Sequence, residues 1–188
     1  DVDLCIGESI TLSSGYDDSY LFTWNTDENT STIEVVESGL YSLSIESPDG
    51  CIASDEMELT VHDLPVVELG EDQSLCEGEN YNIDAENAGS EFLWSTEEVG
   101  QTINVNTTDT YSVTVTDAFG CIGTDELEVV FHQTPIINLP DSMMICIDSP
   151  VELDAGNIGS NYNWSTGDTT QTIIVSTSQL IELTVTNS

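Results

Sequence analysis

The chain has 188 residues, with 36 Asp and Glu, no Lys or Arg, and a formal net charge of −36. Without basic side chains it cannot neutralise a phosphate backbone, so the sequence excludes nucleic-acid binding and disfavours binding to an anionic lipid surface. Catalysis that depends on lysine or arginine is excluded as well. Hydrophobic residues still make up 38% of the chain, too many for a disordered acidic tail. The sequence contains no run of about 20 apolar residues, so it predicts no segment that spans a membrane.

The acidity of the chain has two explanations, which are compatible. One is a solvated, self-repelling surface that keeps a large secreted protein in solution. The other is that divalent cations, with Ca²⁺ as the expected ion, bind among the carboxylates and offset their repulsion. Calcium is therefore the one cofactor that the sequence suggests.

Three successive segments carry runs in which apolar and polar residues alternate. Alternation of period two, bounded by Gly, Asp, Asn and Ser, predicts short, half-buried antiparallel strands, and no window has a helical period. The expected strands include residues 10–12, 21–24, 41–45 and 57–61 in the first segment, residues 65–69, 81–85, 92–94, 103–105, 111–115 and 127–131 in the second, and residues 151–153, 162–164, 173–175 and 183–185 in the third. Residues 117–120 are expected to form a four-residue hairpin turn.

These segments are copies of one unit of about 70 residues, which indicates a tandem array. Trp24, Trp94 and Trp164 recur at this period, as do Tyr41 and Tyr111. One tryptophan and six or seven short strands per unit predict an all-β fold, a tandem array of small Ig-like or PKD-like antiparallel β-sandwiches with these aromatic residues in the cores. The expected domains are 1–64, truncated at its N-terminus, 65–134, complete, and 135–188, truncated at its C-terminus. The short joints containing proline favour a semi-rigid rod.

The second unit also carries a series of motifs: Cys-x-Gly at 76–78, Phe-x-Trp-Ser-Thr at 92–96, Thr-Ile-x-Val at 102–105, and Tyr-Ser-Val-Thr-Val-Thr-Asp-x-x-Gly-Cys at 111–121. In this order the motifs resemble the Ig-like/PKD-like repeats of Bacteroidetes surface proteins. The chain departs from the pattern at Asn25-Thr26 and at Ile147-Asp148. The resemblance implies an extracellular stalk or filament of a very large adhesin, of the gliding-motility type exported by type IX secretion. It implies no catalytic residues.

Five cysteines, Cys5, Cys51, Cys76, Cys121 and Cys146, predict a disulfide framework in a secreted repeat. Two connectivities remain open. The simple one lies within each repeat, Cys5–Cys51 and Cys76–Cys121. In an Ig-like topology, however, Cys76 lies at one end of the domain and Cys121 at the other, about 20 Å away, whereas a disulfide needs Cα atoms within about 7 Å. The geometry therefore slightly favours a Cys5–Cys121 bond between repeats.

Carboxylate-rich loops between the second and third strands are expected to share one pole of the domain with the 117–120 turn and the joint before Pro65. The candidate calcium ligands are Asp63, Glu86 and Asp117, because calcium takes six to eight oxygen ligands. No EF-hand motif is present. His62 and His132 occupy equivalent joint positions and are expected to be structural. The family resemblance also implies O-glycosylation at Ser142 and Thr169, which lie in Asp-Ser/Thr-apolar motifs.

The leading functional hypothesis is a structural one. The repeats are expected to be stalk elements of a long extracellular adhesin or filament at the cell surface, which give it stiff and highly acidic reach. Their partners are neighbouring repeats of the same chain, together with lateral self-association through cations. The alternative is a calcium-dependent carbohydrate- or surface-binding module, and a third reading is an accessory region of a secreted enzyme. The chain itself is not expected to be an enzyme, since no Gly-x-Ser-x-Gly or other catalytic motif occurs.

Overall fold

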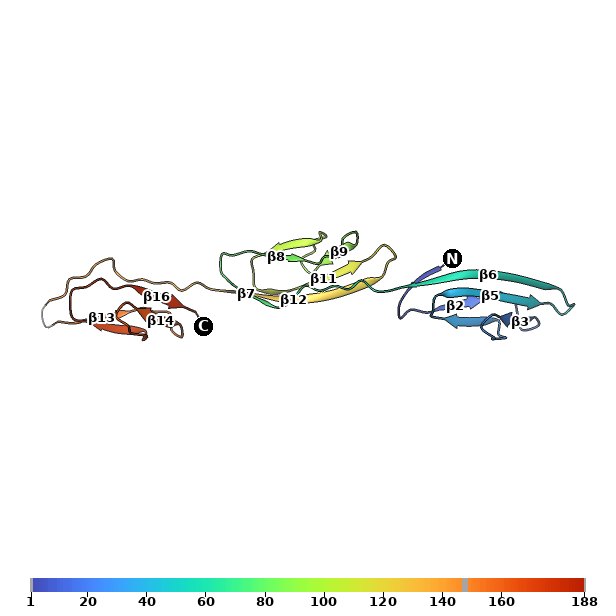
Figure 1. Ribbon diagram of the computed structural model, residues 1–188, viewed down its shortest axis with the longest axis horizontal. Helices are drawn as coiled ribbons and strands as arrows, with labels where there is room; N and C mark the ends of the chain where they lie inside the picture. Colours follow the sequence, from blue (N-terminus) through green and yellow to red (C-terminus); the bar gives the residue numbers. More distant parts are fainter. Residues whose placement is uncertain (1, 147–148, 188) are drawn as a thin grey trace. The chain divides into compact units, whose positions relative to one another are not determined.

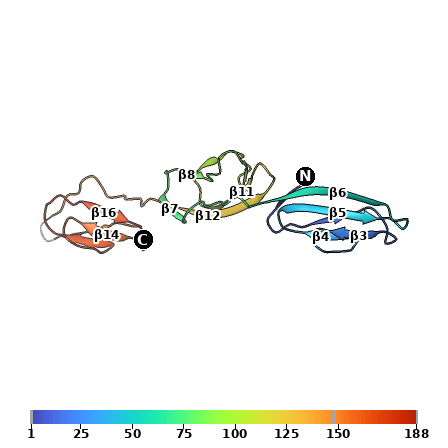
Figure 2. The ribbon, with the colours of Figure 1, turned by 45° about the vertical axis from the view of Figure 1, so that its right-hand side comes forward.

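The computed structural model describes residues 2–146 and 149–187, and every regular element in them is a β-strand (Figure 1). The departure at Ile147-Asp148 lies outside the described residues. In the first repeat, β1 (Val2–Cys5), β6 (Ile52–His62), β5 (Gly39–Glu46) and β3 (Leu21–Trp24) form one sheet in that order. β2 (Ile10–Ser13) and β4 (Thr32–Val35) form the second sheet. Figure 2 shows β5 and β6 running side by side, in antiparallel register.

The second repeat has the same arrangement. Its larger sheet has the order β7 (Gln73–Cys76), β12 (Ile122–His132), β11 (Asp109–Thr116) and β9 (Glu91–Trp94). Its smaller sheet pairs β8 (Tyr81–Asp84) with β10 (Thr102–Val105). In the third repeat, β13 (Val151–Asp154) pairs with β15 (Thr172–Val175), and β14 (Asn161–Trp164) pairs with β16 (Leu183–Thr186). The third repeat thus has two of the strand pairs of the second, those of β8 with β10 and of β9 with β11.

This topology defines an Ig-like β-sandwich, and the predicted fold class is confirmed. The first strand runs parallel to the end of the last strand, Val2–Cys5 beside Leu59–His62, and the remaining pairs are antiparallel. The two central strands of the larger sheet belong to a hairpin, as in Ig domains. Near the start of β5, the Tyr41 hydroxyl donates a hydrogen bond to the Glu37 carbonyl oxygen at 2.8 Å. This contact corresponds to the tyrosine corner of that fold.

The tryptophans lie in the cores, where each is 2–5% exposed. Each indole Nε1 donates a hydrogen bond to the carbonyl oxygen six residues later, at 2.7–2.9 Å. The acceptors belong to Thr30, Gly100 and Thr170. A buried indole N–H needs such a partner, so this bond closes the loop that follows each tryptophan. Tyr111 is 4% exposed, whereas Tyr41 is only half-buried.

Two features differ from the strand pattern expected from the sequence. The parallel strands β1 and β7 were not among the expected strands. Conversely, residues 65–69 form no strand, although burial does alternate along them, with Pro65 and Val67 half-buried and Leu69 buried. The expected turn at 117–120 is present, closed by bonds from Asp117 N to Cys121 O and from Gly120 N to Asp117 O.

Backbone contacts divide the chain into two compact units. One comprises Asp1–Asp72, Tyr81–Val105 and Asp109–Glu128, and the other comprises Gln73–Asn80, Asn106–Thr108 and Val129–Ser188. The first unit therefore contains the whole joint between the first and second repeats.

Candidate functional site

The joint between the first two repeats is cross-linked by a disulfide between Cys5 and Cys121. Their Cα atoms are 5.5 Å apart and their positions in the chain differ by 116 residues. Cys5 is the last residue of β1 and is in register with His62 at the end of β6. Cys121 lies between the hairpin turn and β12 and is 1% exposed. The bond therefore ties the end of one sandwich to the hairpin of the next.

An aromatic contact lies beside the disulfide. The ring of His62 stacks on the ring of Phe119, with centroids 3.6 Å apart and planes inclined by 12°. His62 Nε2 is also 2.7 Å from a carboxylate oxygen of Asp3. The first repeat thus contributes an acid and an imidazole, and the second contributes a phenyl ring and a cysteine. The equivalent His132 in the second repeat contacts Ser74 Oγ at 2.8 Å.

The hairpin turn at 117–120 explains how Phe119 and Cys121 are presented to the joint. One Asp117 carboxylate oxygen accepts hydrogen bonds from the backbone N–H groups of Phe119 and Cys121, both at 2.9 Å. Gly120 has φ 86°, a left-handed conformation that costs glycine little. An aspartate at the start of a turn and a glycine near its end are the residues that such a turn requires.

The within-repeat cysteine pairings considered from the sequence do not occur. Cys51 directly precedes the 11-residue strand β6, whereas Cys5 aligns with the other end of that strand. At about 3.3 Å per residue, Cys5 and Cys51 are about 35 Å apart along the strand. Among the described residues, Cys51, Cys76 and Cys146 are free and exposed. The cross-link therefore runs between repeats, because Cys5 and Cys51 lie at opposite ends of β6 and cannot meet.

The three expected calcium ligands are not brought into one cluster. Asp117 is committed to its own turn, and Glu86 has φ 54° and donates its N–H to Asp84. Asp63 is exposed in the joint. Within the described ranges, no group of three or more His, Cys, Asp or Glu side chains is placed to hold a metal ion. Calcium binding stays a prediction.

The charged form is stabilised at three aspartates: Asp84, the last residue of β8, Asp154, the last residue of β13, and Asp17, in the loop after β2. The Gln101 side chain and the Glu86 N–H donate hydrogen bonds to Asp84 and lower the pKa of its carboxyl. In the third repeat, the Gly156 N–H and the Gln171 side chain lower the pKa of Asp154 in the same way. In the first repeat, the pKa of Asp17 is lowered by Ser19 alone, through its hydroxyl and its N–H.

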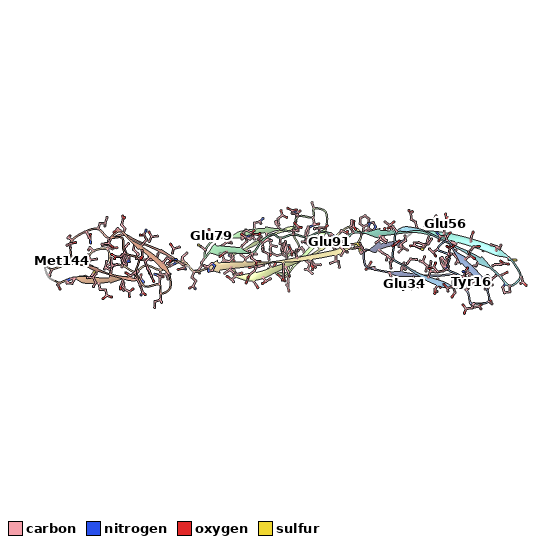
Figure 3. The ribbon with its side chains drawn as sticks, turned by 60° about the horizontal axis from the view of Figure 1, so that its bottom comes forward. Tyr16, Glu34, Glu56, Glu79, Glu91 and Met144 are labelled. Atoms are coloured by element: carbon pink, nitrogen blue, oxygen red, sulfur yellow. A yellow bond between two sulfur atoms is a disulfide. The ribbon has the colours of Figure 1, made fainter. Side chains whose placement is uncertain are left out.

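The remaining sequence candidates are at the surface. Ser142 and Thr169, the expected glycosylation sites, are both exposed, and their modification stays a prediction. None of the described residues is a buried side chain of polar or charged type. Figure 3 shows labelled glutamates, among them Glu34, Glu56 and Glu91, on the outside of the ribbon. No helix among the described residues is long and apolar enough to cross a membrane.

Comparisons with known proteins add the following. No protein-family model matches the sequence, and no curated protein matches it. Solved structures similar to this chain include DIP-gamma IG1+IG2, with 11% identity, TM-score 0.36, and coverage of 69% of this chain and 92% of the other. The N-terminal eight Ig domains of Down Syndrome Cell Adhesion Molecule give 17% identity and TM-score 0.43, over 87% of this chain and 30% of the other.

A third similar structure is the Bacteroides ovatus mixed-linkage glucan utilization locus protein SGBP-B in complex with a mixed-linkage heptasaccharide. It has 13% identity and TM-score 0.26, over 98% of this chain and 59% of the other. At these scores the likenesses carry no inference about function.

Proposed function

We propose that the repeats are stalk elements of a long extracellular adhesin or filament at the cell surface, as the resemblance to gliding-motility adhesins of the type IX pathway implies. The observation that carries the proposal is the Cys5–Cys121 disulfide between consecutive repeats. A cross-link within one domain would stabilise that domain. A cross-link between domains restricts the angle between them, which is the property that a stalk needs.

The surface charge supports the same proposal. All charged residues of the chain are acidic, with a formal net charge of −36. Like charges repel over a distance of about 10 Å at 0.1 M salt, so folding of one repeat back onto another is disfavoured. Lateral association of such chains would require cations to screen or bridge them. The disulfide also favours an oxidising, extracellular location.

Small-angle X-ray scattering on the 188-residue chain and its C5S variant tests the proposal. Loss of the cross-link is expected to broaden the distribution of distances, because the first joint gains freedom. C51S is the matched control, since Cys51 is an exposed free thiol and should change nothing. Thiol titration of the unfolded, unreduced parent is expected to count three reactive cysteines. Identical scattering from all three proteins, or a compact particle in each, would contradict the stalk.

The second candidate, a calcium-dependent carbohydrate- or surface-binding module, is examined by the same measurement. Scattering is recorded with calcium and with a chelator at matched ionic strength. A joint stiffened by the disulfide and by packing is expected to give the same profile in both. A profile that extends only with calcium would place the metal at the joints of a stalk, whereas a compact or flexible profile in both conditions would favour the second candidate.

A further inference from the structure

A cavity of about 690 Å³ opens in the first repeat between β3 and the residues that lead into β4. β3 is the outer strand of the larger sheet, at the edge opposite β1. The loop between β2 and β3, residues 14–20, contributes to one wall. The residues that line the cavity combine one aromatic ring with carboxylate, amide and hydroxyl groups, among them Asp18, Tyr20, Thr23, Asn29, Ser31 and Thr32.

The aromatic ring of the cavity belongs to a pair of tyrosines. The rings of Tyr16 and Tyr20 have centroids 4.8 Å apart and planes inclined by 49°, a tilted contact of the kind that aromatic pairs prefer. Tyr20 is half-buried and lines the cavity. Tyr16 packs against it from outside the lining. The contact therefore holds the ring of Tyr20 in place.

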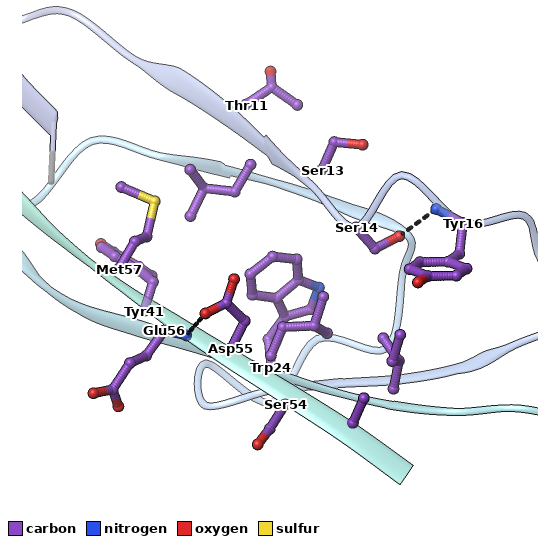
Figure 4. A pocket seen from close by; sticks show the side chains of 14 residues that line it. Thr11, Ser13, Ser14, Tyr16, Trp24, Tyr41, Ser54, Asp55, Glu56 and Met57 are labelled. Carbon is purple, nitrogen blue, oxygen red and sulfur yellow. Dashed lines mark hydrogen bonds between the residues drawn. The ribbon is translucent and has the colours of Figure 1, made fainter. Parts of the chain in front are cut away.

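Hydrogen bonds fix the loop that carries the two rings. The Tyr16 N–H donates to the Ser14 hydroxyl oxygen at 3.2 Å, the bond drawn beside Tyr16 in Figure 4. The Tyr20 N–H donates to the Asp17 carbonyl oxygen at 3.2 Å. The Ser14 N–H donates to the Ser31 carbonyl oxygen at 2.9 Å, so the loop is tied to the opposite wall. A site that is ordered before binding loses less conformational freedom when a ligand arrives.

The second and third repeats lack both tyrosines. Each of the three loops has the same turn bond, from an N–H to the carbonyl oxygen three residues earlier: Tyr20 to Asp17, Ser90 to Asn87, and Ser160 to Asn157. Serine therefore stands in the other two repeats where the first has Tyr20. The loop of the first repeat is also one residue longer, 14–20 against 85–90 and 155–160, and Tyr16 lies in the longer part.

The opposite wall differs between the repeats as well. The bond from Ser14 to Ser31 corresponds to those from Ala85 to Gln101 and from Ala155 to Gln171. The two glutamine side chains each donate to an aspartate of the neighbouring strand, Asp84 or Asp154, at 2.9 Å. The first repeat has a serine at the glutamine position, so it lacks this long side-chain bridge. The residues that build the cavity are thus particular to the first repeat.

We propose that this cavity binds a neutral oligosaccharide, with one sugar ring against the face of Tyr20. A sugar presents C–H groups to an aromatic face and hydroxyl groups to polar side chains. The Asp18 carboxylate accepts hydrogen bonds from such hydroxyls, and the Asn29 amide both donates and accepts them. The cavity volume lies in the range of small-molecule sites. The site needs no calcium, and the inference does not depend on the stalk proposal.

The charge of the chain and the lining of the cavity select against other ligands. An anionic ligand is disfavoured, because the chain has no basic side chain and a formal net charge of −36. A basic peptide segment would match the single carboxylate and the aromatic ring, but not the amide and hydroxyl groups that make up most of the polar lining. A neutral ligand rich in hydroxyl groups matches all of them.

The test measures binding to the 188-residue chain, with its disulfide intact and a chelator present. The probes are neutral oligosaccharides of glucose, mannose, xylose and galactose. The readouts are the dissociation constant from calorimetry and the NMR shifts of the amides of residues 14–32. Y20S introduces the serine of the other two repeats and is expected to weaken binding by at least about tenfold. Y20F keeps the ring and is expected to retain most of the affinity.

D18A and I158A form a matched pair, because Asp18 and Ile158 each follow the residue that accepts the turn bond in their loops. D18A is expected to weaken binding about three- to tenfold through the loss of an acceptor, and I158A to leave it unchanged. No binding of any probe, equal binding by Y20S and the parent, or binding only with calcium would overturn the proposal. Binding of an oligolysine peptide that is lost in Y20S would overturn it in favour of a basic segment. The scattering profile of Y20S should match that of the parent, so the stalk proposal is decided separately.

Discussion

The first and second repeats have the same strands in the same order, but their larger sheets are covered differently. The second repeat buries the inward residues of β11 and β12, with Tyr111, Val113, Val115 and Leu127 each at most 4% exposed. The first repeat leaves their counterparts, Tyr41, Leu43, Ile45 and Met57, half-buried. In the second repeat the short irregular segment at residues 65–69 covers these strands, and the strand register places the corresponding positions of the first repeat before Asp1. Five residues without secondary structure thus complete a core that the strands alone leave open.

The largest expected difference between the two repeats comes from truncating the equivalent side chains Leu127 and Met57. L127A removes a fully buried side chain and is expected to destabilise the second repeat by about 2–5 kcal/mol. M57A removes a side chain that is only half-buried, so its cost should be below about 2 kcal/mol. Hydrogen exchange, read strand by strand, separates the two repeats in the intact chain. Equal losses of stability in the two variants would mean that Met57 is as deeply buried in solution as Leu127.

A second contrast lies at the close approach between β12 and residue 65. G123A places a Cβ 2.1 Å from the Pro65 carbonyl oxygen, so the segment must move, and overpacking of this kind costs about 1–3 kcal/mol. The exchange of the Leu69 amide should rise with it, because its bond to Asp125 is displaced. A53G, at the matching position of the first repeat, removes an exposed methyl group, so no relief of overpacking is expected from it. A G123A chain as well protected as its parent at Leu69 would show that the contact is not made.

The sequence predicts some of these features better than others. The period-two pattern and the repeated tryptophans are sufficient for the strands and the sandwich, because both depend on the spacing of apolar residues. The sequence slightly favoured the Cys5–Cys121 connectivity, because the two cysteines of any one repeat are placed at opposite ends of its domain. The close approach of the Pro65 carbonyl to Gly123 could not be predicted, since nothing in the sequence distinguishes Gly123 from its counterpart Ala53 in this respect. The one signal in the sequence was the largely apolar run at residues 65–69, from which a strand was expected.

The third contrast is the amide that clasps the segment. Asn87 Nδ2 donates to the carbonyl oxygens of Val66 and Ala85, both at 2.9 Å. N87D replaces this donor by the residue that the first repeat has, and it is expected to cost about 1–2 kcal/mol because an acceptor then faces two acceptors. N87A, which removes the bond without the repulsion, is the milder control. A faster exchange of the Val67 and Leu69 amides in N87D than in N87A would identify the repulsion.

The smallest expected effect is a difference in pH dependence between Asp84 of the second repeat and Asp17 of the first. Asp84 is bonded to Gln101, 17 residues away, whereas Asp17 is bonded only to Ser19. Both carboxyls have a lowered pKa in the folded chain. A carboxyl whose folded pKa is depressed stabilises the fold above its unfolded pKa, and this contribution is lost as the pH falls through the lower, folded value. D84N should therefore weaken the pairing of β8 with β10 at neutral pH and make it less sensitive to acid.

The opposite trend is expected from the molecule as a whole. Protonation of 36 acidic residues relieves repulsion as the pH falls, so the parent chain alone cannot isolate one carboxyl. Comparing D84N with its parent cancels this general repulsion, because the two chains lose nearly the same repulsion as the pH falls. D17N provides the matched control, since its carboxyl links no second strand. A pH profile of β8–β10 exchange that changes equally in D84N and D17N would show that the link to Gln101 contributes nothing to the second repeat.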